Sequence, residues 1–362
     1  MASFDALEEG LNQRKSAVYD YLLSSDYKLL LTAPHMLEAF YSYIRRRGKS
    51  LRPAVLMLSC SAVGGDEDRA LPAAAAVEVY HTMTLVHDDI IDRDARRRGG
   101  PAVHIEFRDR AISELRFPRE IARHYGITIA LLTGDLQHSL SIALLTDLYF
   151  KEGLPAELVA TLVRELTLQV GLNLVQGETL DVQFSTFGVQ SVGEEAVMDM
   201  LEKKTGELYR FAAAAGGMIG LRVNKMDAPL VQALANYGIS CGVAFQLQDD
   251  VLGLLGDESV LGKPVGSDIR EGKHTAIVEY ALRKSGPAEQ RVLTQVLGKH
   301  GATKREAQQA LQVLQDLGAI EYAKGLAARY VEQALNALEP LPSSGSKELL
   351  SALARYTVER EL

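Results

Sequence analysis

Two groups of acidic residues are the features of this sequence best suited to chemistry. In the run Asp88-Asp89-Ile90-Ile91-Asp92, the first and last carboxylates lie one turn apart if the segment is helical. Two carboxylates on one helix face repel each other, and a bridging cation removes that repulsion. Such oxygens suit Mg²⁺, which usually also binds substrate phosphate. The spacing therefore predicts a site for Mg²⁺ and a phosphorylated ligand.

A second acidic pair, Asp249 and Asp250, ends another long apolar segment. For one such motif, a solvated acidic face is an equally good interpretation. Two pairs, each at the C-terminal end of an apolar helix, are harder to explain as coincidence, because the two helices could face each other across a cavity. We therefore expect Asp88 and Asp249 to point toward a shared space.

Basic residues accompany both acidic groups, as a site for an anionic ligand requires. Arginine forms forked contacts with phosphate, and lysine provides a point charge. Each basic cluster by itself is more often a solvated charge run. His81 lies two turns before Asp88 on the same face and could donate a hydrogen bond to a phosphate oxygen. The clusters are Lys49 with Arg52, Arg97 with Arg98, Lys203 with Lys204, and the glycine-rich stretch Gly262–Lys273.

Long segments with helical spacing must position these groups. One begins at Pro72 and runs to Asp92, and another runs from Leu230 to Gln248 in alternating steps of four and three residues. Strand-like alternation is hard to find, and the glycine- and proline-rich turns look like loops between helices. We expect one all-α domain over residues 1–362. Further helices are expected at residues 154–185, 195–222, 305–338 and 347–361.

Composition narrows the classes of function. The chain is 47% hydrophobic and 24% charged, as in globular proteins, and its net charge of −8 argues against a nucleic-acid binder. Cys60 and Cys241 form no disulfide framework or zinc motif, which favours a reducing cytoplasm. The N-terminus has no visible signal peptide. The run Phe211–Leu221 falls short of the roughly 20 residues that cross a bilayer, so no transmembrane segment is expected.

Taken together, these motifs resemble the trans-isoprenyl diphosphate synthases (polyprenyl synthetases), and geranylgeranyl diphosphate synthases in particular. The resemblance runs from about Lys49 to Lys273, with the motifs in the family's order. The matching segments are Gly48-Lys49 with Arg52-Pro53, Asp88–Asp92, Arg97–Gly99, Gly134-Asp135, Gln176–Glu178 with Asp181, Lys204–Gly206, Phe245-Gln246 and Gly262-Lys263.

The second acidic motif departs from the family pattern at Gly253, where many members carry a third aspartate. The glycine weakens the case for a third ligand at that place. Activity is still expected, because Asp249 and Asp250 remain and Asp268 could supply another oxygen.

The resemblance implies an all-α fold, a single large bundle of antiparallel helices around a deep central cavity of the isoprenoid synthase type, usually in a homodimer. It also implies condensation of isopentenyl diphosphate with an allylic diphosphate. About two or three Mg²⁺ ions per active site would neutralise charge on the departing pyrophosphate. The residues assigned to catalysis are Asp88, Asp89, Asp92, Arg97, Lys204, Asp249 and Asp250.

The reaction needs no side-chain general base, because pyrophosphate can take the released proton. The binding roles implied by the resemblance fall into three sets. The metal ligands are Asp88, Asp92, Asp249 and Asp268. The residues for isopentenyl diphosphate are Lys49, Arg52, His81 and Arg98. The residues for the allylic diphosphate are Arg97, Lys204, Thr205, Gln246, Lys263 and Lys273.

Product length depends on the residues that precede Asp88, because helical side chains lean toward the N-terminus and should line the product tunnel. These residues are Tyr80, Met83 and Thr84, and their single aromatic ring lies two turns before the aspartate. We expect a product of about twenty carbons, geranylgeranyl diphosphate, with farnesyl or longer chains as alternatives. A class I terpene cyclase and a non-catalytic synthase subunit are the remaining alternatives. A cyclase needs no second diphosphate site, and a non-catalytic subunit should have lost these motifs.

Overall fold

The computed structural model describes residues 4–187, 190–255, 267–299 and 301–359. Helices form nearly all the regular structure there, which confirms the predicted all-α fold; the strands described are the antiparallel pair β1 (Arg96–Arg97) and β2 (Gly100–Pro101). The helices of the first half are α1 (Phe4–Ser24), η1 (Asp26–Leu30), α2 (Pro34–Arg46), α3 (Leu51–Ala62), η2 (Glu67–Ala70), α4 (Leu71–Ile91), α5 (Val103–Ser113), α6 (Arg119–Phe150), α7 (Ala156–Arg164), η3 (Glu165–Val170) and α8 (Gly171–Phe184). Those of the second half are α9 (Glu194–Leu201), η4 (Glu202–Gly206), α10 (Glu207–Leu221), α11 (Pro229–Leu255), α13 (Ser267–Glu271), α14 (Ala276–Lys284), α15 (Pro287–Thr294), α16 (Lys304–Asp316), α17 (Ala319–Ala337) and α18 (Gly345–Glu359).

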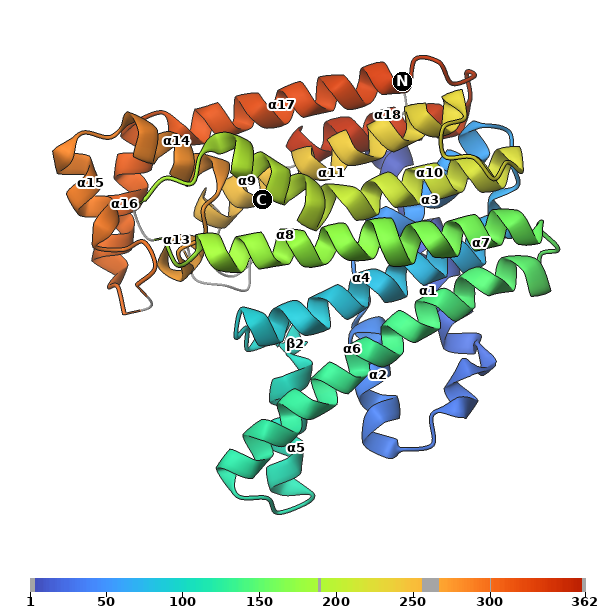
Figure 1. Ribbon diagram of the computed structural model, residues 1–362, viewed down its shortest axis with the longest axis horizontal. Helices are drawn as coiled ribbons and strands as arrows, with labels where there is room; N and C mark the ends of the chain where they lie inside the picture. Colours follow the sequence, from blue (N-terminus) through green and yellow to red (C-terminus); the bar gives the residue numbers. More distant parts are fainter. Residues whose placement is uncertain (1–3, 188–189, 256–266, 300, 360–362) are drawn as a thin grey trace.

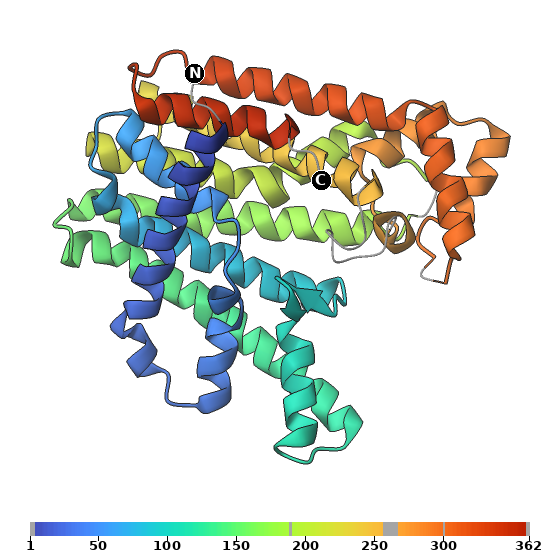
Figure 2. The same cartoon turned by 180° about the vertical axis from the view of Figure 1, so that it is seen from behind.

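The helices are layered along the long axis of the molecule (Figures 1 and 2). α11 packs between α10 and α17, α3 packs on α10, and α4 packs along α6. α5 and the first turns of α6 project from one side as an arm, while α14, α15 and α16 close one end of the bundle (Figure 1). This arrangement places the C-terminal end of α4 on the same side of the bundle as α8 and α13.

The small-residue run Phe211–Leu221 lies in α10, where most of its residues are fully buried. Its alanines and glycines allow α10 to approach α3 and α11 closely. The run is therefore a tightly packed core helix, and its composition reflects space inside the bundle.

Three other helical stretches are long and apolar enough to cross a membrane by length and composition: Arg119–Phe150, Ala156–Phe184 and Pro229–Leu255. The expectation of no such segment, which considered only Phe211–Leu221, overlooked them. The apolar windows differ in burial: 67% of the window in Pro229–Leu255 lies inside the protein, against 39% and 28% in the other two. The outer faces of α6 and α8 thus leave apolar surface exposed.

The predicted helix at 305–338 is wrong as a single element. α16 ends at Asp316, and α17 begins at Ala319 after Gly318, whose φ of 72° lies in the left-handed region. Glycine adopts that conformation without steric cost, so it ends one helix and turns the chain into the next. By contrast, α4 spans Leu71–Ile91, close to the predicted start at Pro72.

Candidate active site

The first acidic motif lies at the C-terminal end of α4. Asp92 is the C-terminal cap of the helix, and its backbone nitrogen donates to the carbonyl of Asp88 at 2.7 Å. The pKa of Asp88 is raised to about 7: burial is the largest cause, Glu178 and Asp92 add to it, and Lys204 and Arg97 oppose it. Asp88 therefore has a carboxylate that is poorly solvated and that gains from an added cation.

Lys204 provides the nearest cation from η4, a π-helical turn between α9 and α10. Its Nζ lies 2.6 Å from Asp181 and 2.7 Å from Glu178, both on α8. Burial alone would lower the pKa of Lys204, but Asp181, Asp88 and Glu178 outweigh it and hold the lysine charged. The π turn, a geometry found often at functional sites, thus presents its ammonium group to three carboxylates.

Close packing between α8 and η4 makes this contact possible. A Cβ atom added at Gly177 would lie 2.5 Å from the backbone nitrogen of Lys204. Only glycine lets the two backbones approach to that distance. In the sequence Gln176-Gly177-Glu178, the glycine therefore allows α8 and η4 to pack closely, and Glu178 supplies a carboxylate that contacts Lys204.

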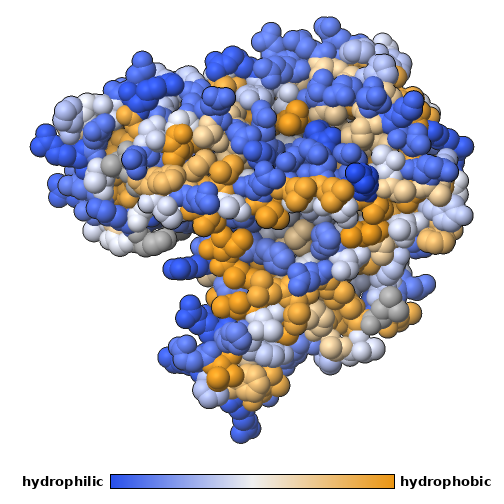
Figure 3. Space-filling view, viewed as in Figure 1, coloured by the Kyte–Doolittle hydropathy of each residue, from blue (hydrophilic) through white to orange (hydrophobic). Residues whose placement is uncertain are grey.

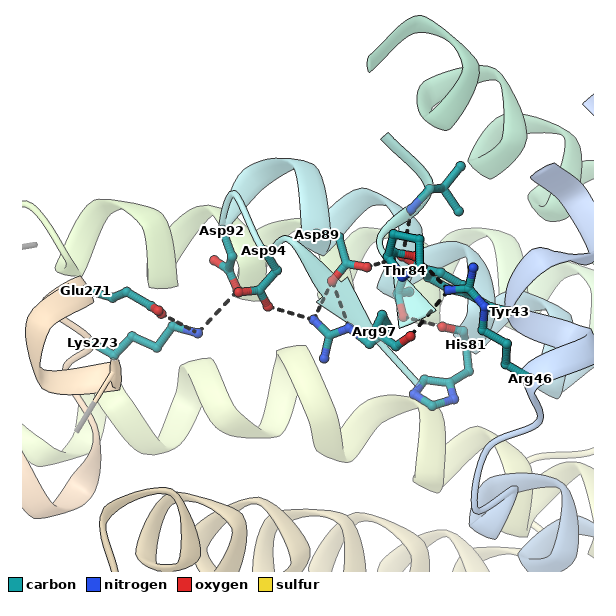
Figure 4. A network of polar contacts seen from close by, with 12 residues as sticks. Tyr43, Arg46, His81, Thr84, Asp89, Asp92, Asp94, Arg97, Glu271 and Lys273 are labelled. Atoms are coloured by element: carbon teal, nitrogen blue, oxygen red, sulfur yellow. Dashed lines mark hydrogen bonds and ion pairs between the residues drawn. The ribbon is translucent and has the colours of Figure 1, made fainter. Parts of the chain in front are cut away.

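Lys273 reaches the first acidic motif from the other side. Its Nζ lies 3.2 Å from Asp92 and 3.6 Å from Glu271, at the end of α13 (Figure 4). Residues 181 positions apart in the sequence are joined by this contact. It brings the C-terminal half of the chain to the end of α4.

The second acidic motif lies near the C-terminal end of α11. Asp250 is buried and accepts a hydrogen bond from the Gln246 amide at 2.9 Å, while Asp249 is partly exposed. Thr205 of η4 in turn donates to Gln246 at 3.2 Å. Because Lys204 interacts with Asp88, the first acidic motif and the chain of contacts from Asp250 converge on adjacent residues of one π turn.

Asp89 is the member of the first motif that turns into the protein. It is fully buried, accepts from Arg97 Nε at 2.7 Å, and accepts from the hydroxyl of Tyr43 (Figure 4). Arg97 also contacts Asp94 at 3.0 Å. The family resemblance assigns Asp89 to the catalytic residues. In the structure its carboxylate is enclosed by these donors, and its contact with Arg97 positions the guanidinium.

Arg98 follows a separate path from its neighbour. It lies in the β1–β2 turn with a φ of 49°, donates to the carbonyl of Tyr43 at 2.8 Å, and pairs with the fully buried Glu78 at 3.1 Å. The hydroxyl of Tyr19 also donates to Glu78 at 2.8 Å. The consecutive arginines are therefore held by different carboxylates of α4.

Arg52 and His81, which the family resemblance assigns to the same substrate, lie in contact. Arg52 Nη1 lies 3.1 Å from His81 Nε2, and the guanidinium lies 4.4 Å from the centre of the Tyr209 ring. Burial, with Arg52 and Arg98, lowers the pKa of His81 well below its usual value, so the imidazole is neutral. A neutral imidazole beside an arginine can donate one hydrogen bond to an anion.

The expected tunnel residues lie on α4 with the acidic motif. Tyr80 and Met83 are buried, and the Thr84 hydroxyl donates to the carbonyl of His81. The Tyr80 ring lies 5.7 Å from that of His138 on α6. Tyr80 therefore lies between α4 and α6, below the carboxylates.

The side chains of two expected binding residues are not described by the structure: one was assigned to the allylic diphosphate and the other to the metal. Lys263 lies outside the described residues, as does the side chain of Asp268, whose backbone lies in α13. Lys49 lies near the Phe245 ring, with its Nζ 6.0 Å from the ring centre.

Sequence reasoning missed the side chains that hold the two arginines, namely Tyr19, Tyr43 and Glu78. Glu78 lies on α4 in the middle of an apolar, alanine-rich run, and a charged residue in such a run was the available signal. No pattern linked either tyrosine to an arginine, because the contacts join residues far apart in the chain.

The described residues fit Mg²⁺ only in part by themselves. Among the residues that the structure describes, no group of three or more His, Cys, Asp or Glu side chains is placed to hold a metal ion. Mg²⁺ does not require such a cage, because it retains water and is usually bound by one or two carboxylates and substrate phosphates. Asp88 and Asp92 are a donor set of that kind.

The all-α fold with this site defines the isoprenoid synthase class of proteins. A family model described as polyprenyl synthetase matches residues 34–314. The chain is 34% identical to a geranylgeranyl diphosphate synthase of Sulfolobus acidocaldarius, over 90% of this chain and 91% of that one. This protein belongs to the polyprenyl synthetase family.

Solved structures agree. A geranylgeranyl pyrophosphate synthetase from Pyrococcus horikoshii has a TM-score of 0.83 at 32% identity and covers 99% of both chains. A geranylgeranyl pyrophosphate synthase from Corynebacterium glutamicum, in complex with isoprenyl diphosphate and magnesium, has a TM-score of 0.84 at 26% identity, covering 99% of this chain and 100% of that one.

Proposed function

We propose that this protein is a Mg²⁺-dependent prenyltransferase that joins isopentenyl diphosphate to an allylic diphosphate and forms geranylgeranyl diphosphate. The observation that carries the proposal is the pairing of two anion sites. Asp88, Lys204 and Lys273 surround one, and Arg52 with His81 forms a second. A reaction between two diphosphates needs both.

The first site suits departure of pyrophosphate from the allylic substrate. Lys204, Lys273 and Arg97 would bind its oxygens, while Asp88 and Asp92 would hold Mg²⁺. When bound, Mg²⁺ neutralises the charge that develops on the leaving group. Breaking the carbon–oxygen bond leaves an allylic cation and releases pyrophosphate with the electron pair.

The second site suits the isopentenyl substrate. Arg52, Arg98, Lys49 and the neutral His81 would bind its diphosphate, with its double bond facing the allylic cation. The double bond supplies the electrons for the new carbon–carbon bond, and pyrophosphate removes the proton that restores a double bond. The protein then has to hold both diphosphates so that the double bond of one substrate faces the reacting carbon of the other.

The length of the product is proposed from Tyr80. It is buried between α4 and α6, two turns below Asp88, while Met83 and Thr84 one turn below are not aromatic. A growing chain can pass the smaller residues and stop at the ring. The names of the similar proteins support a product of this length.

A homodimer is the proposed assembly. Exposed apolar side chains on α6, η3 and α8 form what we call the apolar face: Leu131, Leu132, Leu168, Leu172, Val175 and Val182. Figure 3 shows apolar atoms gathered over these elements on the side turned to the viewer. A contiguous apolar surface of this kind marks an interaction site, and a second copy of the chain would bury it.

Product analysis tests the proposed reaction. The purified protein is incubated with Mg²⁺, labelled isopentenyl diphosphate and each short allylic primer. We expect label in a linear product of about twenty carbons, and a loss of at least about a hundredfold in rate for Asp88→Ala. Cyclic hydrocarbon formed from geranylgeranyl diphosphate alone would instead identify a cyclase, and activity that appears only with a second chain would identify a partner subunit.

A further inference from the structure

The first of two buried relays runs from α2 to Arg97. The hydroxyl of Tyr43 accepts the backbone N–H of Val103 at 3.1 Å and donates to Asp89, which accepts from Arg97 Nε at 2.7 Å (Figure 4). Tyr43 and Asp89 are both fully buried. Of the three side chains in the relay, only that of the arginine is partly exposed.

The second relay runs from α1 to Arg98. The hydroxyl of Tyr19 accepts the backbone N–H of Gly48 and donates to Glu78 Oε1 at 2.8 Å, and Arg98 Nη2 donates to the same oxygen at 3.1 Å. Tyr19 and Glu78 are fully buried. The relay also reaches the loop that carries Lys49.

Both relays have the same order, a buried tyrosine hydroxyl, a buried carboxylate of α4 and an arginine. We propose that Tyr19 and Tyr43 are positioning residues, each for one diphosphate: Tyr43 for the allylic diphosphate through Arg97, and Tyr19 for isopentenyl diphosphate through Arg98. This inference rests on the roles of the two arginines in the proposed function. It adds that Tyr19 of α1 and Tyr43 of α2, which touch neither substrate, each affect the binding of a different one.

The backbone explains how neighbouring arginines serve different sites. Arg98 adopts a φ of 49°, in the left-handed region that a side chain normally avoids. Such a conformation persists only where its surroundings hold it, and here Glu78 and the carbonyl of Tyr43 both bind the guanidinium. The turn sends Arg98 toward Glu78, while Arg97 remains beside Asp89.

A tyrosine is well suited to this task. A long arginine side chain loses conformational freedom when it binds phosphate, and a carboxylate that fixes it beforehand lowers that loss. A buried carboxylate needs hydrogen-bond donors. A hydroxyl supplies one without adding a second positive charge, which would compete with the arginine for the diphosphate. Within the described residues, Glu78 Oε2 has no hydrogen-bond partner, so Tyr19 and Arg98 share the task of satisfying this carboxylate at Oε1.

Crossed substitutions test whether each tyrosine affects a different substrate. Tyr19→Phe should raise the KM for isopentenyl diphosphate roughly tenfold and leave the KM for the allylic primer within about twofold, since a hydrogen bond to a buried charge is worth roughly ten- to a hundredfold in affinity. Tyr43→Phe should do the reverse. Each variant is the other's control, because both remove one hydroxyl that binds a carboxylate of α4. Tyr41→Phe, a buried tyrosine of α2 outside both relays, should change neither KM.

Thermal unfolding and direct binding separate positioning from folding. Isopentenyl diphosphate alone cannot condense, so its Kd is measurable by calorimetry, and Tyr19→Phe should weaken it roughly tenfold while Tyr43→Phe leaves it unchanged. If Tyr19→Phe does not fold, Glu78→Gln replaces it, with the same expected Kd.

The outcomes distinguish this inference from the proposed function. A wild-type protein that does not condense the two substrates overturns both. A wild type that does, with Arg97→Lys and Arg98→Lys each impairing its own substrate, supports the proposed function. In that case, tyrosine variants that raise both KM values equally, or neither, overturn only the relays.

Discussion

At the residue scale, Asp88 has a charge that the folded protein disfavours. Its pKa is raised to about 7 from 3.8, first by burial. The folded protein keeps this proton between about pH 4 and 7, where the unfolded chain has released it, so stability falls as pH rises through that window. Without Mg²⁺, Asp88→Asn should therefore stabilise the protein at pH 8 by on the order of 1–3 kcal/mol, with little effect at pH 4.

Melting temperatures of the metal-free protein at the two pH values measure this effect. Asp316→Asn, exposed on α16 and outside the apolar face, is the matched amide control and should leave both melting temperatures unchanged. An equal gain for Asp88→Asn at pH 4 and pH 8 would show that the charge of Asp88 is not the cause. Asp88→Asn should also lose activity, because a neutral amide oxygen binds Mg²⁺ more weakly than a carboxylate does.

Tyr80 gives a second prediction at this scale. Tyr80→Ala removes the ring between α4 and α6, so the product should extend by at least one five-carbon unit beyond the wild-type product. Tyr80→Phe keeps the ring and should leave the product unchanged. Chromatography of dephosphorylated products measures the distribution. The same distribution for Tyr80→Ala and wild type would remove Tyr80 from chain-length control.

Single residues also show where sequence reasoning succeeded and failed. The family resemblance placed Arg52 and His81 in one binding set, and the structure brings their side chains into contact. The inward turn of Asp89 was not predicted, because adjacent residues of a helix point in different directions and only tertiary packing decides which one is buried.

At the scale of elements, the packing of α8 on η4 predicts that a glycine-to-alanine substitution lowers stability, whereas helix propensity alone predicts that it raises stability. Glycine to alanine inside a helix normally stabilises by about 1 kcal/mol. At Gly177 the added methyl would lie 2.5 Å from the Lys204 backbone, so Gly177→Ala should destabilise by about 1–3 kcal/mol and reduce activity by moving Lys204.

Gly325→Ala is the control, since a Cβ there meets nothing within 4 Å on α17. It should stabilise the protein and leave activity unchanged. Chemical denaturation measures both variants. A stabilised and fully active Gly177→Ala variant would contradict the close approach of α8 and η4.

Helical elements were predictable where the hydrophobic spacing is long and regular, as in α4 and α11. The π turns were not predictable, because the pattern in 154–185 and 195–222 continues through them. Their position depends on packing against other helices, which single-sequence periodicity does not contain.

At the scale of the whole molecule, the apolar face predicts the assembly. Leu172→Glu with Val175→Glu places two charges on it, where the exposed fractions are 58% and 67%. We expect the wild type to be a dimer and this variant a monomer, because burying unpaired carboxylates costs more than the apolar contact contributes. Leu29→Glu, equally exposed on η1 and outside the apolar face, is the control.

Light scattering after gel filtration gives the mass of each variant. A wild-type monomer, or a Leu172→Glu/Val175→Glu variant that remains a dimer, would contradict the proposed interface. The sequence could suggest a dimer only through its family resemblance, since the exposure of α6 and α8 follows from how the helices pack.

Lys204 and Lys273 have one more consequence. Before any substrate binds, their ammonium groups already act as internal counterions for Asp181, Glu178 and Asp92. A bare divalent cation entering the site must compete with both lysines, whereas a diphosphate offers these lysines new oxygens and releases the carboxylates. We therefore expect divalent metal to bind more tightly when the phosphorylated substrate is present than when it is absent.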